Sequence, residues 1–248
     1  MSSAAIASKK PGDVIVACDF PSQQETLDFL DCFPATDKPF VKIGMELFYA
    51  AGPDVVRLLK QRGHKIFLDL KLHDIPNTVK KAMAVLSALD VDMTNVHAAG
   101  TVAMMQAAVA GLTRPDGSRP LLIAVTQLTS TDETRMREEL LIDRPLPEVV
   151  RQYALNARTA GLDGVVCSPL EAPEVHQSCG DGFLTVTPGV RFADADGALQ
   201  NQADQARVTT PELARRLGSD FIVVGRPVTQ AADPLAAYRR CRAEFLGV

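Results

Sequence analysis

The chain repeats one pattern eight times: a short apolar run is followed by a segment whose apolar residues recur at helical spacing. Unbroken apolar runs, as opposed to strict alternation, indicate strands that are covered on both faces, as in parallel sheets. Eight such units within 248 residues predict an α/β fold, a single-domain (β/α)8 TIM barrel. The predicted strands are residues 14–18, 40–44, 65–70, 93–96, 121–125, 164–167, 183–186 and 221–225.

Helical segments lie between these predicted strands and after the last one. A doubly wound open sheet is the alternative fold, but no G-x-G-x-x-G motif follows the first strand. No linker or shift in composition marks a second domain, so we expect a flexible N-terminal tail (residues 1–12) and one barrel domain (residues 13–248). The predicted helices are residues 22–33, 46–62, 76–89, 102–112, 146–160, 169–177, 211–217 and 234–245.

Composition and charge bear on the partners of such a barrel. The formal net charge of −4, with 3 Tyr and no Trp, offers neither the basic surface nor the aromatic platforms that bind nucleic acid. No stretch of 18 apolar residues predicts a membrane span, and residues 1–12 lack the apolar run of a signal peptide. Five cysteines without a C-x-x-C motif predict neither a disulfide framework nor a zinc site. We expect a cytoplasmic protein that binds neither nucleic acid nor membrane.

The segment DLKLHDIPNT, residues 69–78, places three charges at the end of an otherwise apolar strand. Asp69 and Lys71 share one face of an extended chain because they are two residues apart, and Asp74 follows them. Buried Asp and Lys are normally paired, so one interpretation is a structural ion network. The other is a catalytic lysine held between carboxylates. Adjacent carboxylates favour the charged form of Lys71, which disfavours a Schiff base and favours a proton donor.

Polar residues recur at the C-terminal ends of the predicted strands, where TIM barrels carry their chemistry. Glycines at the ends of strands seven and eight let the backbone approach an anion, and Arg226 can contact two phosphate oxygens. We therefore expect a phosphorylated substrate. The residues at the strand ends are Asp19, Lys42, Asp69, Lys71, Asn95, His97, Thr126, Gln127, Thr129, Thr187, Gly189, Arg191, Gly225 and Arg226.

A metal ion shared by Asp69 and His97 is an alternative to this cation-based site. Lys42 and Lys71 would repel such an ion, so we predict that the site holds no metal. The four histidines, His64, His73, His97 and His176, are then interpreted as structural or surface residues.

Two connections, residues 126–145 and 191–208, are long for this fold. Long loops in compact domains are often lids or binding loops. Simple surface insertions are the other interpretation, which carries more weight for the first connection than for the second.

Six separated motifs together resemble the orotidine 5′-phosphate decarboxylase family: DLKLHDIPNT, FVKIGMELF, TNVHAAG, AVTQLTS, TPGVR and VVGR. The resemblance extends from about residue 14 to residue 245. It implies that a homodimeric (β/α)8 barrel decarboxylates orotidine 5′-monophosphate to uridine 5′-monophosphate and CO2 without any cofactor.

The resemblance also implies roles for individual residues. Lys71 would donate a proton to C6 of the pyrimidine, flanked by Asp69 and by the partner subunit's Asp74, and Lys42 would complete the charge array. Residues 191–208 would form a lid that grips the phosphate through Gln205, with Gln200 or Gln202 as alternatives. The implied substrate-binding residues are Asp19, Lys42, Ile75, Thr78, Thr129, Pro188, Arg191, Gln205, Gly225 and Arg226, of which Ile75 and Thr78 cross the dimer interface with Asp74.

Two other functions remain open at this point. One is a Mg²⁺-dependent decarboxylase or synthase that acts on a keto-sugar phosphate and shares the D-x-K-x-x-D pattern. Lys42 argues against it, because such an enzyme would want an acidic metal ligand there. The other is a non-catalytic nucleotide-binding barrel, which the retention of both lysines and both aspartates disfavours.

Overall fold

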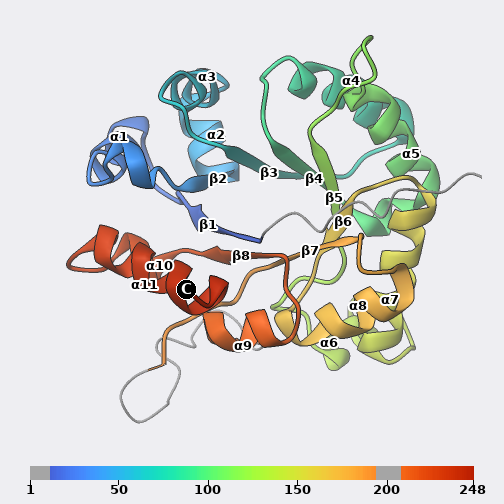
Figure 1. The fold of residues 1–248 in the computed structure, drawn as a ribbon. Helices are drawn as coiled ribbons and strands as arrows, with labels where there is room; N and C mark the ends of the chain where they lie inside the picture. Colours follow the sequence, from blue (N-terminus) through green and yellow to red (C-terminus); the bar gives the residue numbers. More distant parts are fainter. Residues whose placement is uncertain (1–11, 194–207) are drawn as a thin grey trace, which may run out of the picture.

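The computed structural model describes residues 12–193 and 208–248. Eight parallel strands form a closed barrel in sequence order, and β8 pairs back onto β1 (Figure 1). The predicted TIM barrel is therefore confirmed, and the alternative of an open doubly wound sheet is wrong. The strands are β1 (Asp13–Ala17), β2 (Phe40–Gly44), β3 (Ile66–Leu72), β4 (Met93–His97), β5 (Leu121–Val125), β6 (Gly164–Val166), β7 (Leu184–Thr187) and β8 (Phe221–Val224).

Helices surround the strands and form the outer layer (Figure 1). Side-chain caps fix several helix starts: Ser22 accepts from the Glu25 amide at the first helix, and Asp233 accepts from the Ala236 amide at the last one. The helices are α1 (Gln23–Leu30), α2 (Met45–Ala51), α3 (Asp54–Gln61), α4 (Pro76–Ser87), α5 (Thr101–Leu112), α6 (Glu133–Glu138), α7 (Leu146–Thr159), α8 (Ala172–Cys179), α9 (Pro211–Arg216), α10 (Arg226–Thr229) and α11 (Pro234–Leu246).

The barrel has two apolar regions because successive side chains of a strand point to opposite faces of the sheet. One region fills the barrel interior, and its large members include Phe40, Phe67 and Met93. The other lies between the strands and the helices and includes their neighbours Val41 and Leu68. Every second residue of a strand therefore points inward, toward the barrel axis, and this alternation decides which side chains reach the site.

The first and last helices close the ring on the side where β1 meets β8. Figure 1 shows α1 (blue) near α11 (red), and the rings of Phe33 and Tyr238 pack edge to face with centroids 5.6 Å apart. Burial raises the pKa of Tyr238 well above its usual range. On this side β1, which is followed by Asp19, pairs with β8, which is followed by Arg226.

One sequence-based expectation about the helices was wrong, and two short helices were not predicted. The helix expected at 46–62 is two helices, because Gly52 adopts a left-handed φ of 69° and Pro53 follows it. The connection at 126–145 contains α6, whose start is capped by Asp132. A further short helix, α10, begins at Arg226. Both missed helices have fewer than two turns, too short for a helical period to stand out in the sequence.

Two other expectations concern segments that lie mostly outside the residues that the structure describes. Of the expected tail, only Gly12 belongs to the residues that the structure describes, and most of the predicted phosphate lid lies outside them. Within 12–193 and 208–248, no helix has the length and apolar character needed to cross a membrane.

Candidate active site

A cavity of about 360 Å³ opens at the C-terminal end of the barrel. Its apolar lining comes from strand side chains, including Ala17, Val125 and Val223 near the C-terminal ends of their strands and Phe67 deeper in the barrel. Most of the residues predicted for the site line this one cavity: Asp19, Lys42, Asp69, Lys71, Thr129, Pro188, Arg191, Gly225 and Arg226.

Strand parity explains why charged residues reach the cavity from an apolar barrel. Phe40, Phe67 and Met93 fill the barrel interior, and the residues two positions later point to the same side. Those residues are Lys42 on β2, Asp69 on β3 and Asn95 on β4. They are 9%, 7% and 0% exposed, so each of them needs a polar partner.

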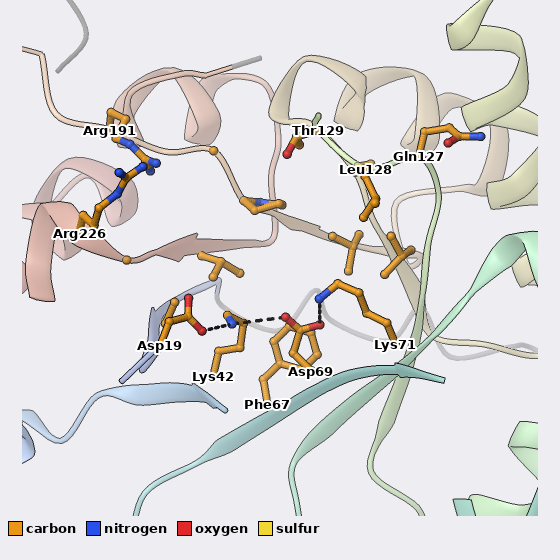
Figure 2. Close-up of a pocket in the computed structure, with 18 residues that line it drawn as sticks. Asp19, Lys42, Phe67, Asp69, Lys71, Gln127, Leu128, Thr129, Arg191 and Arg226 are labelled. Atoms are coloured by element: carbon orange, nitrogen blue, oxygen red, sulfur yellow. Dashed lines mark hydrogen bonds and ion pairs between the residues drawn. The ribbon is translucent and has the colours of Figure 1, made fainter. Parts of the chain in front are cut away.

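The charged groups form a continuous alternating chain (Figure 2). The ammonium nitrogen of Lys42 lies 2.8 Å from Oδ1 of Asp19 and 3.4 Å from Oδ2 of Asp69. The other oxygen of Asp69, Oδ1, lies 2.7 Å from the ammonium nitrogen of Lys71. Both oxygens of Asp69 thus face lysines, and the two lysines flank a single buried carboxylate.

Neighbouring opposite charges keep Lys42 and Asp69 ionised. Burial opposes the charge of Lys42, but the carboxylates of Asp69 and Asp19 outweigh it and raise the pKa of Lys42. Burial likewise opposes the charge of Asp69, but Lys42 and Lys71 outweigh it and lower the pKa of that carboxyl. At neutral pH, Lys42 is therefore a fixed cation and Asp69 a fixed anion.

The backbone that presents Lys71 departs from a regular strand. β3 pairs with β4 at Leu68 and again at Leu72, but the register shifts between these residues. Lys71 has a φ of 51°, in the left-handed region that costs a residue with a side chain about 1–2 kcal/mol. Its amide donates to Oδ1 of Asn95 at 2.8 Å, and Nδ2 of Asn95 donates to Oδ1 of Asp69 at 2.7 Å. Strain of this kind concentrates at functional sites.

The end of the cavity that lies away from Lys71 is strongly basic. Figure 2 shows the guanidinium groups of Arg191 and Arg226 pointing toward one another, on the side of the cavity away from Lys71. The backbone near Arg191 is tied to Thr209 by two hydrogen bonds, from the Arg191 amide to the Thr209 carbonyl at 2.9 Å and from the Thr209 amide to the Gly189 carbonyl at 3.0 Å. Two converging guanidinium groups are suited to bind one anionic group.

Known proteins with similar sequences show to which family this chain, with its charge array and two arginines, belongs. Residues 12–241 match the model of the "Orotidine 5'-phosphate decarboxylase / HUMPS family". The chain belongs to this family. It is 55% identical over 238 residues to an orotidine 5'-phosphate decarboxylase of Bacillus cereus (strain Q1), a match that covers 95% of this chain and 98% of the relative.

Solved structures agree with this family assignment. An orotidine 5'-phosphate decarboxylase from Lactobacillus acidophilus superimposes with a TM-score of 0.82 at 44% identity, over 94% of this chain and 99% of the other. An uncharacterized conserved protein from Geobacillus kaustophilus superimposes with a TM-score of 0.81 at 52% identity, over the same shares of the two chains. The resemblance first drawn from six short motifs thus holds along nearly the whole chain.

Some residues implied by the orotidine 5'-phosphate decarboxylase family lie apart from the cavity lining. Asp74, Ile75 and Thr78 are exposed, and Ile75 exposes 66% of its surface. They lie between the end of β3 and the first turn of α4. Gln205 and its alternatives Gln200 and Gln202 lie outside the residues that the structure describes.

His97 stands near the cavity without lining it. Its ring lies 5.7 Å from that of His73, and burial, followed by the charges of His73 and Lys71, lowers the pKa of His97. Within the described ranges, no group of three or more His, Cys, Asp or Glu is arranged to hold a metal ion. Instead, both oxygens of Asp69, which would have to bind a shared ion, face the ammonium groups of Lys42 and Lys71.

Sequence reasoning placed Asn95 at a strand end but assigned it no role in the family's site. Its side chain contacts two residues of the charge array. The available signal was an asparagine near the end of the predicted strand 93–96, two positions after the apolar Met93 and therefore on the same face of that strand. The apolar lining residues Phe67, Val125 and Val223 could not be predicted from the sequence either, because their residue types are common in any barrel core.

Proposed function

We propose that this protein is an orotidine 5′-monophosphate decarboxylase, a carboxy-lyase that forms uridine 5′-monophosphate and CO2 without a cofactor. The observation that carries the proposal is the chain of charges from Asp19 through Lys42 and Asp69 to Lys71, in a cavity that has two arginines at its other end. Membership of the family and 55% identity to a relative of that name support the same activity.

The reaction breaks the bond between C6 of the pyrimidine and its carboxylate carbon. The electron pair of that bond stays on C6 as CO2 leaves, so a negative charge develops on the ring. The ammonium of Lys71 stabilises this charge and then transfers a proton to C6, which leaves a neutral amine that solvent reprotonates. Preorganised charges of this kind act most strongly where charge develops, and no electron sink on a cofactor is required.

Repulsion by Asp69 supplies only part of the effect. At 4 Å from the substrate carboxylate, Asp69 would contribute about 1–4 kcal/mol for effective dielectric constants between 80 and 20. Enzymes lower barriers by roughly 8–23 kcal/mol, so other terms must dominate. We assign much of the remainder to phosphate binding by Arg191 and Arg226, whose interaction energy holds the reacting ring against Lys71.

The remaining residues would hold the substrate along the cavity. Asp19 and Lys42 would bind ribose hydroxyls, Thr129 the polar edge of the pyrimidine, and Pro188 the neighbouring wall. Gly225 lets the backbone approach the phosphate, and Gln205 would contact the same group. Apolar surface around Phe67 and Val125 suits a flat ring.

The active unit in this proposal is a homodimer. Asp74, Ile75 and Thr78 are exposed beside the cavity-forming end of β3, and an exposed Ile75 suits burial against a partner. We assign these three residues to the partner subunit's site, where Asp74 would extend the alternating charges beyond Lys71. We also assign the protein to the cytoplasm, which suits its five free cysteines.

A subunit-mixing experiment tests the shared site. Lys71→Ala and Asp74→Asn each disable a homodimer, but a heterodimer of the two contains one site with both wild-type residues. Random exchange makes half of the dimers heterodimers, each with one of two sites intact, so about one quarter of wild-type activity should return. No recovery after verified exchange would contradict the shared site.

A decarboxylation assay tests the activity itself. The absorbance of orotidine 5′-monophosphate should fall on adding the wild-type protein, at the same rate with and without EDTA. Loss of activity in EDTA would contradict a metal-free mechanism, and activity on a keto-sugar phosphate with Mg²⁺ but not on orotidine 5′-monophosphate would favour the Mg²⁺-dependent enzyme. Binding of the nucleotide without any fall in absorbance would favour the non-catalytic barrel.

A further inference from the structure

We propose that Asn95 is a positioning residue whose buried carboxamide fixes the main chain of Lys71 and the carboxylate of Asp69 together. The inference rests on the proposed function, because it assigns Asn95 the task of holding the proton donor at the reacting carbon. Asn95 itself does not line the cavity and so acts through Lys71 and Asp69.

The hydrogen bonds around Asn95 form a closed ring. Oδ1 of Asn95 accepts from the Lys71 amide at 2.8 Å, and Nδ2 donates to Oδ1 of Asp69 at 2.7 Å. The same oxygen of Asp69 accepts from the Lys71 ammonium at 2.7 Å. One side chain therefore holds both ends of Lys71, the amide directly and the ammonium through Asp69.

The strand register shows why this position needs a side-chain acceptor. β3 and β4 pair at Leu68 with Thr94 and next at Leu72 with Val96. Three residues of β3 (69–71) thus lie opposite the single residue Asn95 of β4, which makes a bulge in β3. Bulges commonly re-aim a side chain next to an active site, and this one includes the left-handed φ of 51° at Lys71.

Loss of the Asn95 carboxamide would release both held groups. The Lys71 main chain could relax into the broad extended region that a lysine prefers, which turns its Cβ away from its present direction. Asp69 would lose a donor that fixes which of its oxygens faces Lys71 and which faces Lys42. A misplacement of about 1 Å at a reacting group can lower a rate about 100-fold.

Two variants separate this role from a structural one. Asn95→Ala removes both contacts, and Asn95→Asp keeps an acceptor for the Lys71 amide but sets a carboxylate against Asp69. The matched control is Thr94→Val, because Oγ1 of the buried Thr94 also donates from β4 to β3, to the Leu68 carbonyl at 3.0 Å, without touching Asp69 or Lys71.

The expected results differ in kcat, KM and affinity for uridine 5′-monophosphate. Asn95→Ala should lower kcat about 100-fold and leave KM and nucleotide affinity within about threefold, because the phosphate end is untouched. Thr94→Val should lower the melting temperature but keep kcat within about twofold of wild type. Equal kcat losses in Asn95→Ala and Thr94→Val would show a structural role and overturn the inference.

The pH dependence of Asn95→Asp provides a readout that stability alone would not move. Two carboxylates within hydrogen-bonding distance share one proton, whose apparent pKa is raised. That proton restores a donor to Asp69, so the kcat of Asn95→Asp relative to wild type should rise as the pH is lowered from 8 to about 5. A flat ratio across this range would contradict the proposed contact.

A crystal structure of Asn95→Ala tests the geometry independently of any activity. We expect Lys71 to leave the left-handed region or its ammonium to move away from Asp69. An unchanged Lys71 backbone and an unchanged Lys71–Asp69 pair would overturn the inference. If the wild-type protein failed to decarboxylate orotidine 5′-monophosphate, the proposed function would fail, and this structural comparison would still decide whether Asn95 positions Lys71.

Discussion

Replacing Asp69 by asparagine removes the carboxylate that lies between Lys42 and Lys71. The amide keeps the shape of the side chain but must turn its NH2 group toward one of two ammonium groups. The three side chains are 10% (Asp69), 11% (Lys42) and 25% (Lys71) exposed, so the remaining charges stay largely buried. Removing one partner of a buried ion pair costs about 3–5 kcal/mol.

We expect the lower end of this range for Asp69→Asn. Lys42 keeps its contact with Asp19 at 2.8 Å, and the exposed quarter of Lys71 lets water screen its charge. A loss of about 3 kcal/mol in a chain of 248 residues lowers the melting temperature by about 6–12 °C.

The pH dependence of this stability difference has a defined sign. Burial raises the pKa of Asp69, but Lys42 and Lys71 outweigh it and hold the pKa below its ordinary value. A carboxyl with a lowered folded-state pKa contributes stability that is present above its unfolded pKa of about 3.9 and is lost as the pH falls through the folded pKa. The difference in the free energy of unfolding between wild type and Asp69→Asn should therefore be constant from about pH 5 to 8 and become smaller below about pH 4.

Asp163→Asn is a matched control at the opposite end of the barrel. Asp163 pairs with Arg119 and accepts from the Leu122 amide at 2.7 Å, and the paired side chains are 20% and 25% exposed. Calorimetry and the decarboxylation assay should show that both variants melt lower, but that only Asp69→Asn loses kcat, by about 100-fold or more. A melting temperature and a kcat of Asp69→Asn equal to those of wild type would refute the reasoning.

Three further changes test other parts of the molecule. Arg226→Ala should raise KM about 10–100-fold, because a charge-assisted contact contributes about 1.5–3 kcal/mol, and an unchanged KM would place the phosphate elsewhere. Gly44→Ala puts a Cβ 3.0 Å from both Oδ1 of Asp19 and Nζ of Lys42, so kcat/KM should fall on the order of fivefold. The control is Gly182→Ala, which should leave kcat/KM unchanged because its Cβ meets nothing within 4 Å. A thiol reagent should label Cys32 first, since it is exposed while burial raises the pKa of Cys18 to about 12, and Cys32→Ser should abolish the fast phase.

Much of the barrel could be read from the sequence because each strand is a short, mainly apolar run followed by a segment with helical spacing. β2 and β5 were predicted to the residue, and the other strands to within two residues. The break between α2 and α3 was missed even though Gly52 and Pro53 mark it, since the apolar spacing of the two helices gave the impression of one. The helical spacing of the apolar residues therefore predicted one helix, although Gly52 and Pro53 separate two helices in the structure.

The site could be read in part, because strand ends in a barrel converge by topology. The sequence predicts Asp19, Lys42, Asp69 and Lys71 on one rim of the barrel, and all four line the cavity. The bulge at Lys71 could not be predicted, since it depends on the pairing of β3 with β4 and on the Asn95 side chain. The roles of Asp74, Ile75 and Thr78 stay predictions, because they require a second chain.

The proton-donor role of Lys71 is the centre of the account, and one comparison tests it most directly. Wild-type and Lys71→Ala proteins are assayed for decarboxylation of orotidine 5′-monophosphate in EDTA, with the melting temperature as a measure of folding. We predict that wild type turns over fully and that Lys71→Ala stays folded but loses at least about 1000-fold in kcat. Near-normal turnover by a folded Lys71→Ala protein would contradict the account.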